Sequence, residues 1–345
     1  MANWFADIKD LKTNAVGGAV ASTMNISSAQ PSIDSAERDY LVPALGATTL
    51  ALIKSEIGIL SPSPDQIMAC KLLKKAVGYL GVYNYLKFGG VEFGEGGLLR
   101  VETADKKTAY RRQENDFREG LRKEGFEAIE EAFLFLEANL TYSTAFKLTA
   151  TYKAARAVFT YSAGLMREQY DANVSRDTFN ALRATLVQAH IFEVKKLLPA
   201  QFYAWIKNIH DTATPDADQS TVIDYLKKIE TYYAIESAMY RNLVKLNGTD
   251  VVITERAYAE DGGQQQKLPP LDVWRVANSY HREVAITYTK LLREFVETNK
   301  TLFPTAISTD IGGTNADADA WLPVLTDTEI CENEAVQMAR HFVEM

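Results

Sequence analysis

An internal repeat is the feature that most constrains how this chain can fold. The segment DQIMACKLLKKAVGYL, residues 65–80, returns as DQSTVIDYLKKIETYY, residues 218–233, displaced by 153 positions. At the same displacement, and without gaps, the apolar positions of residues 32–53 coincide with those of residues 185–206. This match indicates a duplicated unit of about 150 residues, because tandem copies of one structural unit leave self-similarity at a fixed period.

Each copy is predicted to be mostly helical. Leu73, Ala76 and Leu80 recur at spacings of three and four residues, which places them on one face of an α-helix. Asp65 follows a proline and is expected to cap this helix. The residues expected in the core are the equivalent pairs Leu73 with Leu226 and Ile53 with Ile206, together with the aromatic residues Trp205 and Tyr233.

The remaining elements follow the same order in both copies. In the first, helices are predicted at about residues 28–41 and 48–57, with Pro43 and Gly46 turning the chain between them. Gly-rich turns around short β-like runs then predict a β-hairpin in each copy, and a long helix follows. The predicted hairpins lie at residues 88–101 and 244–255, and the long helices at about 109–139 and 272–299.

The predicted fold is therefore mainly α, with two tandem helical units that each carry a small β-hairpin excursion. The first unit is expected at residues 1–150 and the second at 151–304. Residues 305–345 are expected to form an acidic arm that ends in an amphipathic helix. A capping-box pattern at residues 326–329 precedes apolar residues at helical spacing, namely Cys331, Ala335, Met338, Phe342 and Met345.

Charge is concentrated in that arm. The whole chain has a net charge of −8, and residues 305–345 hold eight acidic residues against one basic residue, Arg340. The remaining chain is nearly neutral and shows no clustered excess of Lys and Arg, so electrostatic binding of nucleic acid is not indicated. The most apolar stretch, residues 40–60, is interrupted by Lys54 and Glu56, and no membrane-spanning segment or secretion signal is predicted.

The sequence shows only weak motifs for a metal, cofactor or catalytic site. His190, His210, His281 and His341 have no partner at metal-ligand spacing, so no metal, cofactor or catalytic residue is predicted. The adjacent acids Glu130 and Glu131 are expected to be solvated on a helix surface.

The string DIGGTN, residues 310–315, resembles the phosphate-binding turn of glucokinase-type sugar kinases. A Gly-rich linker is the preferred interpretation, because no convincing strand precedes it, and a sugar or small-molecule kinase remains an alternative.

Several segments resemble a family of phage and prophage head–tail connector proteins, also called head-completion or neck adaptor proteins, from Bacteroidota. The likeness covers roughly residues 1–301 and is most distinctive in GLLRVETADKKTAY, residues 97–110. FADIKDLKT, SAERDYLVPALG and LKKAVGYLGVYNYLKFGGVEF also carry it, as do FLFLEAN and, in the second half, SRDTFNALRATLVQAHIFEVKKLLPA and LKKIETYYAIESAM. Nothing of the family is carried over to the arm.

The resemblance implies a virion structural protein without an active site. Proteins of this kind form a ring, often twelvefold, that binds the portal and bridges it to the tail or to other neck proteins. Packaged DNA passes through the ring without sequence-specific binding. The implied location is the neck of the virion, assembled in the bacterial host cytoplasm, with no membrane partner. Another neck or tail-completion ring protein remains an alternative.

Two regions are expected to make contacts with neighbouring chains. The hairpins offer Val91, Phe93, Val251 and Ile253. The C-terminal arm offers Trp321, Met338 and Phe342, and it has too little core of its own, so it is expected to lie in a groove. That groove belongs either to the arm's own body or to an adjacent subunit or the portal.

Overall fold

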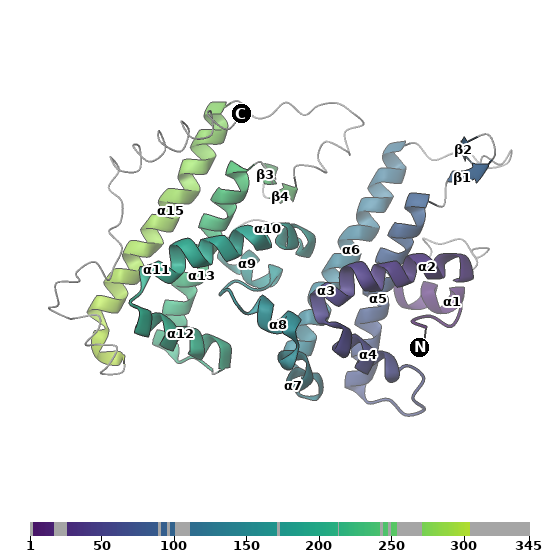
Figure 1. The fold of residues 1–345 in the computed structure, drawn as a ribbon, viewed down its shortest axis with the longest axis horizontal. Helices are drawn as coiled ribbons and strands as arrows, with labels where there is room; N and C mark the ends of the chain where they lie inside the picture. Colours follow the sequence, from purple (N-terminus) through teal and green to yellow (C-terminus); the bar gives the residue numbers. More distant parts are fainter. Residues whose placement is uncertain are drawn as a thin grey trace.

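The fold is known from a computed structural model. It describes residues 3–16, 26–88, 91–94, 97–100, 111–170, 173–212, 214–241, 244–247, 250–253 and 271–303. Within these ranges the chain is mainly helical and forms two similar units (Figure 1). Among the helices described there, none is long and apolar enough to span a membrane.

Each unit is built on a pair of long helices with a shorter helix crossing them. In the first unit the pair is α5 (Pro64–Phe88) and α6 (Arg111–Ala138), and α2 (Ile26–Ala36) packs on α5. In the second unit the pair is α13 (Ala217–Tyr240) and α15 (Leu271–Thr298), and α10 (Arg176–Ala189) packs on α13 (Figure 1). The shorter elements are α1 (Ile8–Leu11), η1 (Lys12–Val16), α3 (Val42–Leu45), α4 (Ala47–Ser55), α7 (Leu140–Leu148), α8 (Ala150–Ala155), α9 (Ala163–Gln169), α11 (Lys195–Leu197), α12 (Ala200–Thr212) and η5 (Lys300–Leu302).

The start of the central long helix explains why the glutamine of the Asp-Gln pair recurs in the sequence. Ser63 and Gln66 form a reciprocal cap on α5, in which the Gln66 amide oxygen accepts from the Ser63 N–H at 2.8 Å. Asp216 and Gln219 form the same capping box on α13. The prediction that Asp65 caps the helix is wrong, since Asp65 lies in the first turn and its carboxylate accepts from the Thr141 hydroxyl.

A π-helix occurs at the same place in both units. It spans η3 (Glu37–Leu41) in the first and η4 (His190–Val194) in the second, again 153 positions apart. In the first unit the helical path then continues into α3, where Pro43 lies in the first turn and needs no N–H partner. Pro43 therefore does not turn the chain as predicted; Gly46 alone does so, with a φ of 85°.

Short antiparallel strand pairs lie between the long helices of each unit. In the first unit β1 (Val91–Gly94) pairs with β2 (Gly97–Arg100), and Val91 lies opposite Arg100. In the second, β3 (Val244–Asn247) pairs with β4 (Asp250–Ile253). The two pairs have the same register at a displacement of 153 positions, so the repeat extends through them.

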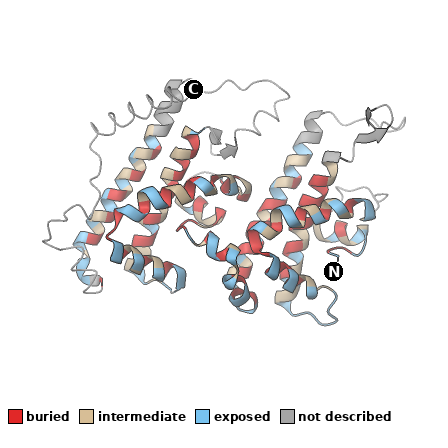
Figure 2. Ribbon diagram, in the orientation of Figure 1, coloured by how far each residue is buried: buried red, intermediate tan, exposed pale blue. Residues whose placement is uncertain are grey.

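Apolar side chains form separate cores in the two units. One cluster runs from Trp4 to Ala155, and two further clusters lie between Phe159 and Phe303. Figure 2 shows these buried residues along the facing sides of the packed helices. The expected burial of Leu73, Leu226, Ile53 and Ile206 is confirmed. Trp205 and Tyr233 are half-buried at the edge of the core and not in its centre.

Candidate functional site

The first candidate is the junction between the units, where a buried ion pair joins α6 to α10. The Arg176 guanidinium donates to the Glu130 carboxylate at 2.6 Å, and both side chains are 2% exposed. Glu130 also accepts from the backbone N–H of Gly164 in α9, and Arg176 lies over the ring of Phe133. The prediction that Glu130 is solvated is therefore wrong, although its neighbour Glu131 is exposed as expected.

A second buried carboxylate holds the connector, which we define as residues 156–162 between α8 and α9. Glu230 of α13 is fully buried and accepts from the backbone N–H groups of Phe159 and Thr160 at 3.2 and 2.6 Å. Its third partner is His190 Nδ1 at 2.7 Å, and the other ring nitrogen of His190 lies 2.6 Å from the Tyr203 hydroxyl. A buried charge with this many partners fixes the groups around it.

The first unit also binds this connector. Glu137 of α6 accepts from the hydroxyls of Tyr152 and Tyr161 at 2.6 and 2.9 Å. Its carboxylate also lies 3.7 Å from the Arg156 guanidinium, which donates to the carbonyl of His210 in α12. Burial lowers the pKa of His210 and raises the pKa of Tyr161. The connector is thus bound by both units and is not a free hinge.

The junction is held together by hydrogen bonds between buried polar side chains. Glu230, His190 and Tyr203 form a hydrogen-bonded series like an acid–base relay. Burial raises the pKa of Tyr203 to about 12, so its hydroxyl stays protonated near neutral pH. In the part of the chain that the structure describes, no group of three or more His, Cys, Asp or Glu residues is placed to hold a metal ion.

A cavity of about 250 Å³ opens at one end of the first unit, near the start of α5. Its lining includes Glu56, Ile67, Cys70 and Lys74. Burial raises the pKa of the Cys70 thiol, which keeps it protonated and weakly nucleophilic. Lys74 is already paired with Asp10 at 2.9 Å. Two of the groups that line the cavity are therefore a protonated thiol and a lysine that is already paired.

The same end of the first unit exposes a group of apolar side chains, here called the Ile67 end. The fully exposed Leu60 and the 54% exposed Ile67 belong to it. Thr141 donates to Asp65, which brings the exposed Leu140 of α7 close to the start of α5. The residues of the Ile67 end are Ile59, Leu60, Ile67, Met68 and Leu140.

The equivalent end of the second unit is polar. At a displacement of 153 positions, Thr212, Ser220 and Thr221 replace Ile59, Ile67 and Met68. The two units therefore share a backbone but present different chemistry at equivalent surfaces. Comparing the repeats position by position, and asking where only one copy is apolar, would have found the Ile67 end in the sequence.

The residues predicted to make contacts are placed only in part. Val91 and Phe93 lie in β1, and Val251 and Ile253 lie in β4, but the side chains of all four are outside the described residues. Trp321, Met338 and Phe342, together with the predicted C-terminal helix and DIGGTN, also lie outside the described ranges.

Comparison with known families agrees with the duplicated architecture. The model of a family of unknown function (DUF6712) matches the chain twice, at residues 32–156 and 191–315. The two matches confirm the internal repeat, and the second reaches far enough to include DIGGTN. Searches of the curated proteins and of the solved structures found no match.

Proposed function

Because this chain belongs to the family of unknown function DUF6712 through both of its repeats, we propose its role from the surfaces that those repeats expose. The proposed role is a virion structural protein, a head–tail connector or neck adaptor that forms a ring between the portal and the tail. In this role the protein holds other chains in position and catalyses no reaction.

The observation that carries the proposal is the unlike chemistry of equivalent ends. The Ile67 end is apolar and exposed, whereas the second unit has Thr212 and Ser220 at the matching positions. An exposed apolar group of this kind favours contact with another chain. A contact is heterologous when neighbouring subunits meet through two different surfaces. Repeating it closes a ring when the rotation between neighbouring subunits divides a full turn evenly.

The junction supports the same role. The buried Glu130–Arg176 pair joins the units directly, and Glu230 binds the connector to the second unit. A ring of defined size needs subunits of constant shape, because each interface repeats the same rotation. Tying both units to one connector supplies that constancy.

The proposed partners follow from the resemblance to head–tail connectors. They are further copies of this chain in a ring, the portal protein, and tail or other neck proteins, with packaged DNA passing through. In this proposal the hairpins contact neighbours through Val91, Phe93, Val251 and Ile253. The C-terminal arm adds contacts through Trp321, Met338 and Phe342.

Electron microscopy of the purified protein tests the proposal. We expect rings in negative-stain images, either of the protein alone or after addition of a portal protein. Deleting the residues after Thr305 should leave a folded body that no longer joins the neck assembly. A protein that stays monomeric under both conditions would contradict the proposed role.

The kinase alternative rests on DIGGTN alone and makes a separate prediction. A sugar or small-molecule kinase would bind nucleotide, so calorimetric titration of the purified protein with ATP and Mg²⁺ separates it from the adaptor role. A different neck or tail-completion ring would instead form rings that bind a partner other than the portal.

A further inference from the structure

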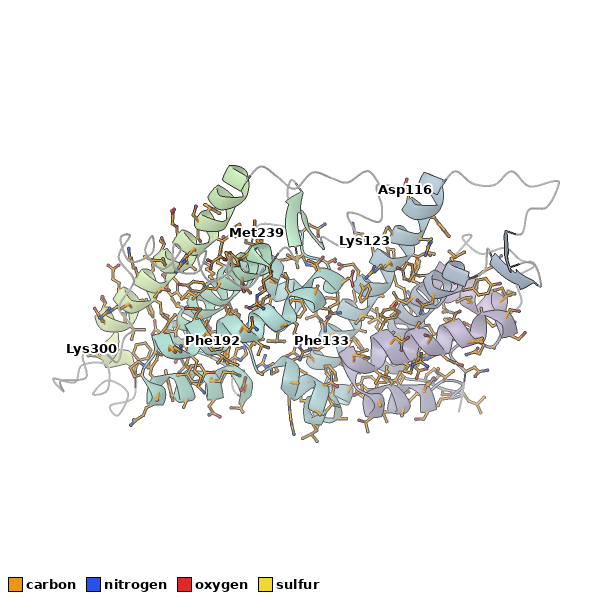
Figure 3. All side chains as sticks on the ribbon, turned by 45° about the horizontal axis from the view of Figure 1, so that its top comes forward. Asp116, Lys123, Phe133, Phe192, Met239 and Lys300 are labelled. Atoms are coloured by element: carbon orange, nitrogen blue, oxygen red, sulfur yellow. The ribbon has the colours of Figure 1, made fainter. Side chains whose placement is uncertain are left out.

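The surface of the second π-helix, η4, carries an exposed apolar pair flanked by lysines. Ile191 and Phe192 are 47% and 55% exposed, and Lys195 and Lys196 are exposed one turn further on. The Lys196 ammonium lies 5.5 Å from the centre of the Phe192 ring. These four residues are called the η4 patch, and Figure 3 labels Phe192 on the second unit.

The backbone under the η4 patch is held firmly. His190, the first residue of η4, points inward to Glu230 and Tyr203, and Val194 is fully buried. A π-helix inserts one extra residue per turn, and such insertions are frequent at functional sites. With positions 190 and 194 fixed inward, Ile191 and Phe192 are kept at the surface.

The first unit shows that this exposed pair is not required by the fold. Its π-helix η3 has Arg38 and Asp39 at the equivalent positions, and these two side chains pair with each other at 2.9 Å. Val42 and Pro43 stand where the second unit has Lys195 and Lys196. The surface of the π-helix is therefore polar in one repeat, where its two side chains pair with each other. In the other repeat it is apolar and carries added positive charge.

We propose that the η4 patch binds the C-terminal segment of the same chain, residues 305–345. This segment has eight acidic residues and one basic residue, so its charge complements the two lysines of the patch. Its sequence predicts an amphipathic helix with Met338 and Phe342 on the apolar face. An apolar helix face with acidic flanks fits an apolar surface with basic flanks, as in helix-in-groove recognition.

The position of the last described residue places this segment within reach. Phe303 packs on the rings of Phe202 and Trp205 in α12, at 5.2 and 5.8 Å. Helix α12 follows directly on α11, which carries Lys195 and Lys196. A coil as long as the stretch from Phe303 to Trp321 would span roughly 20 Å, which is enough to reach the patch from that side.

The inference concerns the isolated protomer and does not rest on the proposed virion role. Every copy carries both the segment and the η4 patch, so neighbouring copies in an assembly can exchange segments, as in domain swapping. The first repeat offers no second site, because Arg38 and Asp39 already satisfy each other.

Amide hydrogen exchange of the full-length protein tests the inference. We expect residues 327–345 to exchange about tenfold more slowly in the native protein than in the Ile191→Glu/Phe192→Glu variant. Lys195→Glu/Lys196→Glu should also remove the protection, because it reverses the charge of the patch. Two control variants, Arg38→Glu in the first π-helix and Leu60→Glu at the Ile67 end, should leave the protection unchanged.

All the substituted side chains are on the surface, so circular dichroism should show every variant folded. Protection that is unchanged by tenfold dilution assigns the docking to the same chain. Absent protection in the native protein, equal protection in the η4 variants, or protection that falls on dilution would each overturn the inference. Ring formation is measured separately, so failure of the adaptor role would leave this result standing.

Discussion

The two repeats place the same helix in different environments, and the difference shows what the duplication added. In α6 adjacent positions such as Ala128, Ile129 and Glu130 are all buried, since α6 packs on its own unit and on α10 of the next. In α15, the equivalent helix, buried positions recur only every three or four residues. In these helices FLFLEAN (residues 133–139) aligns with REFVETN (residues 293–299), a displacement of 160 positions. The position equivalent to Glu130 is therefore Lys290, which is exposed.

Buried polar groups follow the same distinction. Glu230 is fully buried in α13, but the equivalent residue of α5 is Val77, which is also fully buried. The fold therefore accepts an apolar side chain at this position. In the second unit Glu230 accepts hydrogen bonds from the connector and binds His190. These contacts explain why the core of the second unit contains a polar group at this position.

The sharpest test of the comparison introduces the same charged residue at equivalent surface positions of the two units. Ile67→Asp should abolish ring formation, because a charge at the centre of the Ile67 end opposes burial in an interface. Ser220→Asp makes the same change at the matching position of the second unit and should leave rings intact. Negative-stain images and native mass spectrometry measure both. Equal behaviour of the two variants would show that the Ile67 end is not an interface.

Glu230→Val gives the second repeat the residue of the first. We expect a loss of about 3–5 kcal/mol in the free energy of unfolding, because the backbone N–H groups of Phe159 and Thr160 and the ring of His190 lose their acceptor. Urea denaturation measures the loss. Glu230→Gln keeps part of the hydrogen bonding and should lose less. A loss below about 1 kcal/mol for the valine variant would mean that the junction does not depend on this carboxylate.

The paired caps offer a test in which the repeats should behave alike. Ser63→Ala and Asp216→Ala each remove the side-chain acceptor at the start of a central helix. Each should lower the free energy of unfolding by about 1 kcal/mol, measured by urea denaturation. Clearly unequal losses would indicate that the two central helices contribute differently to their units, in spite of the shared capping pattern.

The smallest expected effect is a pH dependence confined to the second unit. Burial lowers the pKa of His210, and the first unit has Ile57 at that position. Because the unfolded histidine, with an ordinary pKa of about 6.5, binds a proton more readily than the folded one, stability is fully present above pH 6.5 and falls below it. Denaturation midpoints between pH 7.5 and 5.5 should show this decline.

His210→Asn removes the titrating group and should flatten the decline. Asp211, next in the chain, does not account for this pH window. Burial acts to raise the pKa of Asp211, but hydrogen bonds from His210 and Lys207 outweigh that effect and lower it below its ordinary range. The stability that Asp211 contributes is therefore lost only in stronger acid. An unchanged profile in the asparagine variant would assign the decline to other groups.

Sequence periodicity predicted the elements whose residues interact locally. The repeat, the long helices and the burial of Leu73 and Leu226 follow from spacings of three and four and from the 153-residue displacement. The cap lies two positions before the predicted Asp65, because Pro64 takes the first helical position, where its missing N–H is not needed, and Ser63 precedes it.

The junction could not be predicted in this way. Whether Glu130 is solvated or buried depends on Arg176, which lies far along the chain and meets it only after the units pack. The π-helices likewise have no signature in the apolar pattern, since one inserted residue shifts that pattern only slightly. The exposure of Ile191 and Phe192 depends on this π-helix, whose equivalent in the first unit has Arg38 and Asp39 at the same positions.

The connector has a geometric consequence for any closed assembly of this chain. Glu137 of the first unit and Glu230 of the second both accept hydrogen bonds from the connector, so the angle between the units is fixed within each subunit. Around a closed circle that angle is added once per member, and a change of a few degrees accumulates over the circumference. Altering the junction between the units, for example with Arg176→Lys, would then change how many subunits complete the circle without preventing the subunits from joining.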